Sequence, residues 1–557
     1  MQTLIQEVAT AHSPESLVAQ FADESGLVLL WSGMADPAQS RYSFVAARPF
    51  LTFRSFGSRC EIQFPAAADM DPRTLRPATG RTGPPTHVGG HVQFGSPWHV
   101  LDELMGRYEL LDEPDLPFPL GGCFGFWGYD LKNFVEPKLR RRATNDLELP
   151  DCHVGFYDSL VAFDHQLDKA WIISTGLAAD GSRNESRARQ QAEYWHHHLA
   201  ETLTPALSLS EREREKRLPP NVHHKSADNP AANMARILPR PLGGGEGWGE
   251  GEIRSNLSRA EFLTRVERAQ RYIRAGDIYQ VNLSQQLTAA LPCSSWEFFQ
   301  RLSAVSPAPF AAFLDCGEFQ LASSSPELFL RLDGSRIVTR PIKGTRPRSA
   351  NADEDARLAY ELQTSAKENA ELLMITDLLR NDLGRVCEYG SVLVPDLMRL
   401  ERFAQVQHLV STVEGRLRRE VTHLAALAAC FPGGSITGAP KFRAMEIIDE
   451  LEPTSRGPFC GALGYLGFNR ASQFSIIIRT AICKDGTVYF PVGAGIVSDS
   501  QPAAEYDETL AKAGGFLAAL ARPGMNESAP LVPHVVAIAD RKSKMSLTCQ
   551  SDRCENK

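Results

Sequence analysis

The sequence predicts an α+β fold, in which helices pack on β-sheets. Two observations lead to this prediction. Short runs rich in β-branched and aromatic residues recur through residues 6–203 and are separated by loops. Between residues 256 and 520, amphipathic helical patterns alternate with apolar runs typical of strands. The 557 residues exceed what one core usually supports, so we expect at least two domains or one large two-lobed body.

Residues 6–203 form the first predicted lobe, a mixed α+β unit. A helical pattern extends from Trp98 to Leu110. The predicted strands are LVLLW (27–31), YSFVAA (42–47), LTFRSF (51–56) and AWIIS (170–174).

Residues 256–520 form the second predicted lobe, in which the periodicity is stronger. Apolar residues at helical spacing predict helices at Glu261–Ala275, Lys367–Leu383, Lys441–Leu451 and Ala504–Leu520. Apolar runs predict strands at SRIVTRPI (335–342), FSIIIRTAIC (474–483) and TVYFPVGAGIV (487–497).

Residues 204–255 and 521–557 differ from both lobes in composition. The first segment contains the charge run SEREREKR and the glycine-rich run LGGGEGWGEGE. It has too little apolar content to bury, which predicts a disordered insert between the lobes. The glycine run does not match a phosphate-binding loop, because no strand precedes it and no GK[ST] follows. The segment 521–557 is polar, and we expect a loose tail.

Composition argues against several classes of function. The net charge of −8 argues against a nucleic-acid surface, and no apolar run reaches the length of a membrane span. The N-terminal segment lacks the basic start and apolar core of a secretion signal, so we expect a cytoplasmic protein. The 11 cysteines occur singly, without a CxxC pair, which predicts reduced thiols that are buried or incidental.

Two predicted helices carry glutamates three positions apart, Glu368 with Glu371 and Glu505 with Glu508. Residues at i and i+3 share a helix face, so these like charges repel unless a cation neutralises them. Apolar residues follow the first pair, which suggests a buried helix, where carboxylates need a partner. Oxygen donors without His or Cys suit Mg²⁺ better than zinc. The alternative, commoner for either pair alone, is a pair of solvated surface glutamates.

Two glycine-rich segments could bring backbone amides to a ligand. FPGGSITGAPKFRAMEIIDELE (431–452) runs from a turn into a helix. Free amides at that helix start, with Lys441 and Arg443 beside them, predict an anion site sized for a carboxylate. VGAGIV (492–497) is a second such place, because glycine has no Cβ to block a close approach. Ordinary tight turns are the alternative in both cases.

Arg479 lies within the predicted strand FSIIIRTAIC. A strand of isoleucines is expected to be buried on both faces, so an arginine within it needs a planar anionic partner. An internal salt bridge and a substrate carboxylate fit this residue about equally.

Lys343 in RPIKGTRPR (340–348) lies where an apolar run meets a turn, among arginines that already supply positive charge. The run LFLRLDGSRIVTRPIK predicts a strand, an Asp-Gly turn and a second strand, and such a hairpin could bring Glu327 near Lys343. A lysine in a dry pocket loses its proton more readily and can act as a nucleophile, while a nearby carboxylate can shuttle the proton. Taken alone, a lysine at a strand end is usually solvated.

Together these motifs resemble one family, the chorismate-utilising enzymes, which include the large components of anthranilate synthase and aminodeoxychorismate synthase. The first lobe resembles the family more loosely, through RYSFVAARP and PFPLGGCFGFWGYD. The resemblance implies chorismate as substrate and a fold in which large β-sheets form a sandwich core with helices packed outside. In the second lobe the segments that carry the resemblance are GDIYQVNLSQ, SSSPELFL, RPIKGTRPR, ENAELLMITDLLRNDLGR, VQHLVSTVEG, FPGGSITGAPKFRAMEIIDELEP, GALGYLGF, SIIIRTA and VGAGIVSDSQPAAEYDETLAKA.

Within this family the position of Lys343 separates two subclasses. Anthranilate synthases resemble PIAGT there, whereas aminodeoxychorismate synthases resemble PIKGT, as this chain does. The resemblance implies that Lys343 attacks C2 of chorismate, that Glu327 is the general acid for loss of hydroxide from C4, and that ammonia then adds at C4 and expels the lysine. Ammonia would come from a separate glutamine amidotransferase subunit, and the product would feed p-aminobenzoate and folate synthesis.

The resemblance also implies ligands for Mg²⁺ and contacts for the substrate. Glu371 and Glu508 resemble direct ligands of Mg²⁺, and Glu368 and Glu505 resemble residues that reach the ion through water. The residues that resemble holders of the enolpyruvyl carboxylate are Arg479, Tyr465 and the amides of Gly493, Ala494 and Gly495. The residues expected to line the pocket are His408, Thr437 and Lys441.

Other positions bear on the alternatives. Gln280 stands where isochorismate and salicylate synthases resemble a lysine, and a glutamine cannot act as a base toward water, which argues against a hydroxylated product. RYSFVAARP lacks the acidic-serine pattern associated with feedback control in anthranilate synthases, so we expect no inhibition by tryptophan. The competing functions are anthranilate synthase and a catalytically silent partner of an amidotransferase. The four glutamates and Lys343 argue against the silent partner.

Overall fold

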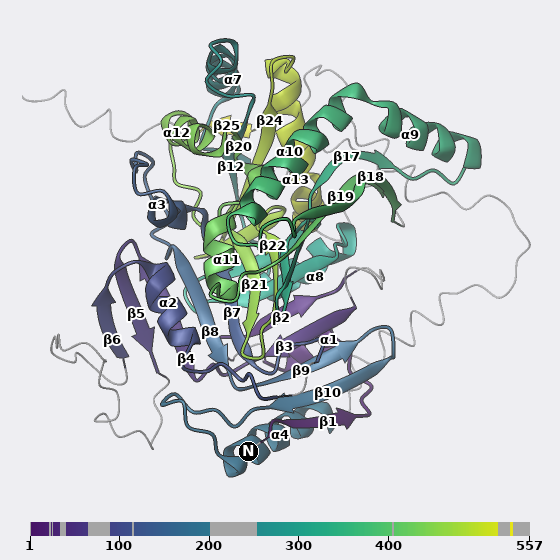
Figure 1. The fold of residues 1–557 in the computed structure, drawn as a ribbon. Helices are drawn as coiled ribbons and strands as arrows, with labels where there is room; N and C mark the ends of the chain where they lie inside the picture. The colour runs from purple at the N-terminus through teal and green to yellow at the C-terminus, as the bar shows by residue number, and fades with distance from the viewer. Residues whose placement is uncertain are drawn as a thin grey trace, which may run out of the picture.

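A computed structural model describes residues 2–21, 24, 26–33, 41–64, 90–113, 116–200, 253–403, 406–521 and 535–537. Within them, two large sheets form a sandwich with a shared hydrophobic core, and helices lie around it (Figure 1). All neighbouring strands in the described sheets are antiparallel except one pair. Rings from the two sheets meet in the core, where the centroids of Phe44 and Tyr465 are 5.3 Å apart. The predicted α+β sandwich is confirmed.

The first sheet contains strands from both halves of the chain. In spatial order its strands are β1 (Leu4–Val8), β10 (Lys169–Ser174), β9 (Ser159–Asp164), β3 (Tyr42–Ala46), β2 (Val28–Trp31), β13 (Phe310–Asp315), β14 (Gln320–Ser325), β23 (Thr480–Lys484), β24 (Thr487–Ile496), β12 (Gln280–Ala290), β11 (Ile253–Ser255) and β25 (Val535–Ala537), with β20 (Gly438–Ala439) beside β12. Its long central pair is β12 and β24, which align from Val281 opposite Ile496 to Ala290 opposite Thr487.

The second sheet also joins the two halves. Its order is β17 (Ile342–Pro347), β19 (Val406–Arg416), β16 (Arg336–Arg340), β15 (Leu328–Asp333), β22 (Ala471–Ile476), β21 (Ala462–Gly467), β7 (Gly122–Trp127), β8 (Cys152–Tyr157), β4 (Leu51–Phe56), β5 (Arg59–Gln63) and β6 (Gly90–Phe94), with β18 (Leu393–Arg402) beside β19. The halves meet where β2 pairs with β13 and where β7 pairs with β21.

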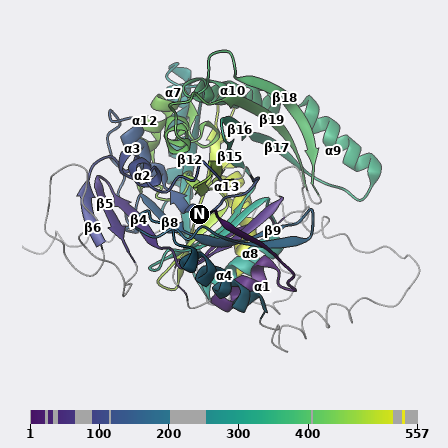
Figure 2. The ribbon, with the colours of Figure 1, turned by 60° about the horizontal axis from the view of Figure 1, so that its bottom comes forward.

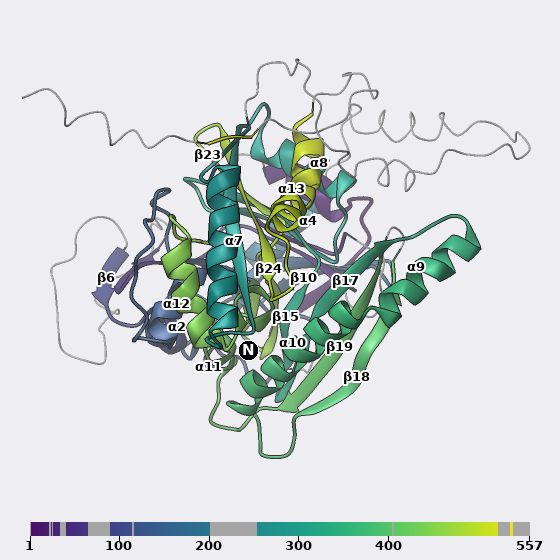
Figure 3. The same cartoon turned by 90° about the horizontal axis from the view of Figure 1, so that it is seen from above.

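The helices lie on the outside of the sheets. They are α1 (Pro14–Val18), α2 (Pro97–Met105), α3 (Lys132–Val135), α4 (Glu185–Ala200), α7 (Arg259–Arg274), α8 (Ser295–Val305), α9 (Ala352–Thr364), α10 (Ala366–Gly384), α11 (His423–Cys430), α12 (Lys441–Leu451) and α13 (Pro502–Leu520), together with the short turns η1 (Ala19–Phe21), η2 (Tyr129–Leu131) and η3 (Gly434–Ile436). Helices α7, α12 and α13 cover β12 and β24 (Figure 3). Helix α4 packs on β9 and β10 at the opposite end, seen at the bottom of Figure 2.

Helices α9 and α10 lie with strands β17, β18 and β19 in one projecting layer, which all three views place together (Figures 1 to 3). Helix α10 begins at Ser365, whose side chain accepts a hydrogen bond from the Glu368 amide, a strong N-cap. Helix α13 has Pro502 in its first turn, where the missing N–H costs nothing. These two helices carry the paired glutamates.

The predicted helices of the second half are confirmed to within a few residues, but one predicted strand is wrong. FSIIIRTAIC is two strands in two different sheets, because β22 ends at Ile476 and β23 begins at Thr480. The residues between them carry the chain from one sheet to the other. Arg479 adopts a left-handed conformation there, with φ of 51°. The predicted helix at Trp98–Leu110 likewise ends early, at Met105, before Gly106.

Other predictions fall at the edges of the described residues. Most of the predicted insert, residues 204–252, lies outside them, but its last residues, Ile253–Ser255, form β11. Most of the predicted tail also lies outside them, whereas Val535–Ala537 form β25, which pairs in parallel with the free edge of β11. The nine described cysteines are all unpaired, as predicted. Within the described residues, every helix is too short or too polar to cross a lipid bilayer.

Candidate active site

The structure brings the glutamates of α10 and α13 into one charged cluster. Burial raises the pKa of Glu371, and the charges of Glu368 and Glu508 act in the same direction. The charges of Lys343 and Lys367 act against this rise. Two carboxylates on separate helices influence each other in this way only when they face one another, because solvent screens distant charges.

Each of the other three glutamates has a polar or cationic neighbour. Burial also raises the pKa of Glu505, although Ser500 donates a hydrogen bond to its Oε1 at 2.6 Å. Burial opposes ionisation of Glu508 as well, but the charge and hydrogen bond of Lys512, 2.7 Å away, prevail and lower its pKa. Glu368 lies 3.6 Å from the guanidinium of Arg346.

The donor set fits a hard cation by type. The four side chains offer only carboxylate oxygens. The pKa values of Glu371 and Glu505 are raised because burial disfavours their charged forms. A bound cation would stabilise these charged forms. No group of three acidic, His or Cys side chains in the described part of the chain is already arranged around a common point. An ion would therefore have to draw these carboxylates together.

Glu327 is a buried acid on which the charge of Lys343 acts. It lies between β14 and β15 and is 7% exposed. Burial raises its pKa, while a hydrogen bond from Ser435 and the charge of Lys343 act in the opposite direction. Strands β15 and β16 form the predicted hairpin, with Leu328 opposite Arg340, so its two ends bring Glu327 and Lys343 together. A carboxyl group held in its neutral form is suited to donate a proton.

Lys343 lies on β17, between Glu327 and the glutamate helices. It is half-buried and pairs with Leu409 of β19, and a bulge follows at Gly344. Gly344 has φ of 67°, and a Cβ there would lie 2.6 Å from Leu362 Cδ1 and 3.2 Å from Glu368 Cδ. Only glycine allows this close approach of β17 to α10. The sequence therefore places the lysine against the acidic face of that helix.

Arg479 and His408 border the same cluster. Burial lowers the pKa of Arg479, and the charge of Glu508 acts against this effect. Burial lowers the pKa of His408, whose Nδ1 lies 2.9 Å from Thr345 Oγ1, and the charge of Arg479 adds to the fall. Of the two partners predicted for Arg479, a protein carboxylate and a substrate carboxylate, the structure brings the first within electrostatic reach, as Glu508 of α13.

Gly493, Ala494 and Gly495 lie on β24, which packs against helix α13. One edge of this segment pairs with β12, where Gly493 faces Ser284 and Gly495 faces Asn282. The pairing with β23 on the other edge ends at Tyr489, so that edge is open at the glycines. The carbonyl of Gly493 accepts a hydrogen bond from Lys512 Nζ at 2.8 Å. A Cβ at Gly495 would lie 2.4 Å from Gln280 Nε2, so the amide of Gln280 would have to shift to accept one.

Lys441, a residue predicted to line the pocket, forms an ion pair with a carboxylate of α10. Its amine lies 2.6 Å from Asp382 Oδ2 and 3.0 Å from the carbonyl of Cys430, so its charge is already neutralised by the protein. Arg443 is paired in the same way with Asp277 and Glu446. The start of α12 therefore has no uncompensated cation for a substrate anion. Thr437 is fully buried beside it, and its hydroxyl donates to the carbonyl of Gly433 at 3.0 Å.

Tyr465, predicted to hold the enolpyruvyl carboxylate, is buried. It lies on β21 in the interior of the sandwich, with its ring 5.3 Å from that of Phe44 and 5.4 Å from that of Phe124. Burial raises its pKa, and the charged groups that act on it are Arg331 and Asp333 rather than the glutamates. Tyr465 lines a small pocket of about 30 Å³ with Trp31.

Sequence reasoning missed Lys512, Ser435 and Lys367. Lys512 follows Glu508 by four residues, a spacing that places oppositely charged side chains together on a helix and that could have identified it. Lys367 adjoins Glu368 in sequence. Ser435 reaches Glu327 only through the folding of η3 onto β15, which no sequence spacing predicts.

Comparisons with known proteins agree with this geometry. A model of the chorismate binding enzyme family matches residues 87–518. The chain is 35% identical to anthranilate synthase component 1 of Acetivibrio thermocellus over 518 residues, 93% of this chain and 94% of the relative. It is 37% identical to aminodeoxychorismate synthase component 1 of Escherichia coli strain K12 over 492 residues, 88% of this chain and 92% of the relative.

A solved structure supports the same conclusion. The crystal structure of anthranilate synthase component I from Streptococcus pneumoniae TIGR4 covers 86% of this chain and 92% of its own, with 29% identity and a TM-score of 0.64. Because the family match runs through both sheets and the relatives align over nearly their whole length, the chain belongs to the chorismate binding enzymes.

Proposed function

We propose that this chain converts chorismate to 4-amino-4-deoxychorismate, with ammonia supplied by a glutamine amidotransferase subunit. The observation that carries the proposal is the position of Lys343, whose charge acts on Glu327 on one side and on Glu371 and Glu508 on the other. Anthranilate formation needs no amine at this position, because ammonia itself would attack C2. The proposed reaction gives this lysine a role as nucleophile, besides the charge that it places near Glu371.

The proposed reaction has two displacements. The amine of Lys343 forms a bond to C2 of chorismate while the C4 hydroxyl leaves as water, with its proton supplied by Glu327. Ammonia then bonds to C4, the C2–N bond to Lys343 breaks with its electron pair returning to the amine, and the extra proton of the new C4 ammonium returns to Glu327. Two easier steps replace one difficult substitution. The neutral form of Glu327 favoured by burial is the one that this role requires.

We propose Mg²⁺ as the ion held by the glutamates of α10 and α13, with Glu371 and Glu508 as direct ligands and Glu368 and Glu505 acting through water. When bound, it would polarise the ring carboxylate of chorismate. The side chain of Arg479 and the open edge of Gly493–Gly495 would then hold the second carboxylate of the substrate. His408, hydrogen-bonded to Thr345, would border the ring.

The component 1 names of the relatives support a partner subunit as the source of ammonia, and we propose p-aminobenzoate and folate synthesis in the cytoplasm as the setting. The decisive test is the product formed by the purified chain with chorismate, Mg²⁺ and ammonium. Chromatography with mass detection should find the 4-amino product, and the four-glutamate site predicts loss of turnover on chelation. Anthranilate fluorescence without that product would overturn the assignment in favour of anthranilate synthase.

Two variants sharpen the test. Lys343→Ala should lose the 4-amino product and turn toward anthranilate, since ammonia can then approach C2. Lys343→Arg is the matched control, because it keeps the charge beside Glu371 but cannot act as the nucleophile. In the unaltered protein, denaturation during turnover should leave the added mass of the substrate on the peptide that contains Lys343.

A further inference from the structure

Arg456 and Glu452 form a buried ion pair just after α12. The Arg456 side chain is 2% exposed and that of Glu452 is 5% exposed. The pair is bidentate, with Arg456 Nε 2.8 Å from Glu452 Oε2 and Nη2 2.7 Å from Oε1. The guanidinium also stacks over the ring of Tyr129, at 4.7 Å from its centroid. A charge pair this deep costs desolvation and is favourable only with good geometry and further hydrogen bonds.

Those further hydrogen bonds lead to two backbone segments. Arg456 Nη2 donates to the carbonyl of Asn282 at 3.0 Å, and Glu452 Oε1 accepts from the amide and hydroxyl of Ser284 at 2.8 Å each. These contacts provide hydrogen-bond partners for the backbone groups on the edge of β12 between the short strands β20 and β11. On its other side, Arg456 Nη1 donates to the carbonyl of Ile436 in η3 at 3.0 Å.

Both segments are part of the candidate active site. Ile436 follows Ser435, whose side chain acts on the pKa of Glu327, and the same loop packs against β15, because a Cβ at Gly433 would lie 3.5 Å from Phe329 Cε2. Asn282 and Ser284 lie opposite Gly495 and Gly493 of β24. The two segments are also joined to each other, because the amide of Asn282 donates to the carbonyl of Thr437 at 2.8 Å. The guanidinium of Arg456 therefore fixes the distance between the η3 loop, which lies beside Glu327, and strand β12, which pairs with Gly493 and Gly495.

We propose that Arg456, held by Glu452, is a positioning residue for the chemical step, which it serves by fixing the loop of Ser435 relative to β12 and so aiming Glu327 at the substrate. The proposal rests on the proposed role of Glu327 as general acid. It does not depend on which carbon ammonia attacks, since both candidate products require loss of the C4 hydroxyl.

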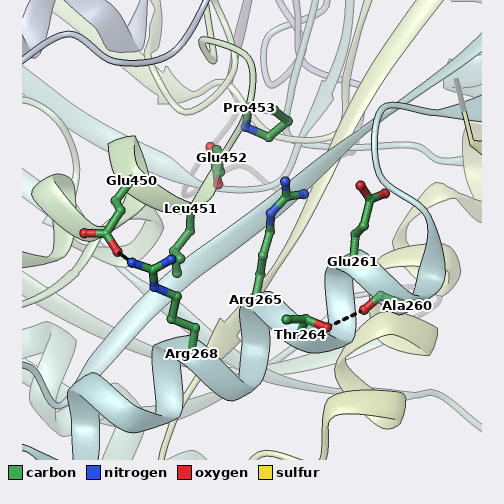
Figure 4. Close-up of a pocket in the computed structure, with 9 residues that line it drawn as sticks. All are labelled: Ala260, Glu261, Thr264, Arg265, Arg268, Glu450, Leu451, Glu452 and Pro453. Atoms are coloured by element: carbon green, nitrogen blue, oxygen red, sulfur yellow. Dashed lines mark hydrogen bonds and ion pairs between the residues drawn. The ribbon is translucent and has the colours of Figure 1, made fainter. Parts of the chain in front are cut away.

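The cavity shown in Figure 4 supplies the matched control. It measures about 450 Å³, lies between α7 and the end of α12, and has Glu452 at its back (Figure 4). Arg265 of α7 reaches into it toward Glu452, yet its buried Nη1 has no hydrogen-bond partner. Arg265 thus offers the same charge near the same carboxylate, without a bond to the active-site backbone.

The experiment measures kcat and KM for chorismate consumption, with ammonium and Mg²⁺, in Arg456→Lys, Ser435→Ala, the double variant and Arg265→Met. We expect Arg456→Lys to lower kcat about 10²-fold with little change in KM, as a small displacement of an acid would do. The double variant should be no slower than the slower single variant, because both changes act through the same contact with Glu327. Arg265→Met should keep the kcat of the unaltered protein.

Three outcomes would overturn the proposal: an unchanged kcat in Arg456→Lys, a multiplicative loss in the double variant, or an equal loss in Arg265→Met. If Arg456→Lys does not fold, Glu452→Gln carries the same expectations, since it keeps the shape of the side chain and removes its charge. Product identity is recorded separately. Anthranilate as the product would refute the proposed function and leave the kcat comparison intact.

Discussion

The amine of Lys512 donates a hydrogen bond to the carbonyl of Gly493 at 2.8 Å and lies 2.7 Å from the carboxylate of Glu508. One side chain thus links helix α13 to the glycine segment of β24. Burial lowers the pKa of Lys512, and the charge of Glu508 acts against the fall. This contact sets the distance between a candidate metal ligand and the candidate carboxylate site.

Lys512→Met should lower kcat/KM for chorismate by about 10²-fold, because the glycine segment loses its anchor and Glu508 loses its cation. The pKa of Glu508 should rise for the same reason. Steady-state kinetics over a range of Mg²⁺ concentrations would measure both effects. Lys484→Met is the control, since Lys484 Nζ donates to the carbonyl of Leu147 and has no part in the site. Equal losses in the two variants would contradict the prediction.

Gly344→Ala should impair both folding and turnover. The new Cβ would lie 2.6 Å from Leu362 Cδ1, and a non-glycine residue at φ of 67° adds about 1–3 kcal/mol of backbone strain. Displacement of β17 from α10 should move Lys343 and reduce kcat. Gly486→Ala is the control that separates backbone strain from the contact with Leu362. Gly486 also has a positive φ, of 68°, but nothing lies within 4 Å of its Cβ position. Denaturant unfolding should show the strain in both variants, and only Gly344→Ala should lose turnover.

The pH dependence of the reaction should report Glu327. As the proposed general acid, it must be protonated, so kcat should fall as pH rises through its raised pKa. Ser435→Ala removes a hydrogen bond that favours the carboxylate, so it should move this fall to higher pH. A pH–rate profile of the two proteins would measure the displacement. A shift to lower pH would refute the assignment of Glu327 as the acid.

Glu327 should also make the free energy of unfolding depend on pH, because its pKa differs between the folded and the unfolded protein. Burial raises the folded-state pKa of Glu327, so the folded protein holds this proton more tightly than the unfolded chain does. Its contribution to stability is complete below the unfolded pKa and is lost as pH rises through the folded pKa. Glu327→Gln, which has no proton to lose, should therefore gain stability relative to the unaltered protein as pH increases, as measured by urea unfolding.

Tryptophan should not inhibit turnover. The pocket beside Tyr465 and Trp31 offers about 30 Å³, enough for a water or two and far too little for an indole ring. A rate assay titrated with tryptophan would test this expectation. The informative variant is Trp31→Ala, which enlarges the pocket. If tryptophan inhibits this variant and not the unaltered protein, the side chain of Trp31 is what keeps tryptophan out.

Local features of the sequence predicted much of this molecule. Helical periodicity located α10 and α13, and the i, i+3 glutamates identified their shared acidic face. Except for the early end of α2, what the sequence does not predict concerns long-range pairing. Asp382, the partner of Lys441, belongs to another helix, and the ring neighbours of Tyr465, Phe44 and Phe124, come from the first half of the chain. Arg479 lies at a crossover between sheets, which an unbroken apolar run conceals.

The interleaving of early and late strands also decides how the polypeptide can be divided. A protease cut between Ala200 and Ile253 should leave two fragments that stay associated, because β2 with β13 and β7 with β21 hold them through backbone hydrogen bonds. Either fragment made alone would expose long unpaired strands and should aggregate, whereas the two made together should reassemble into one working enzyme.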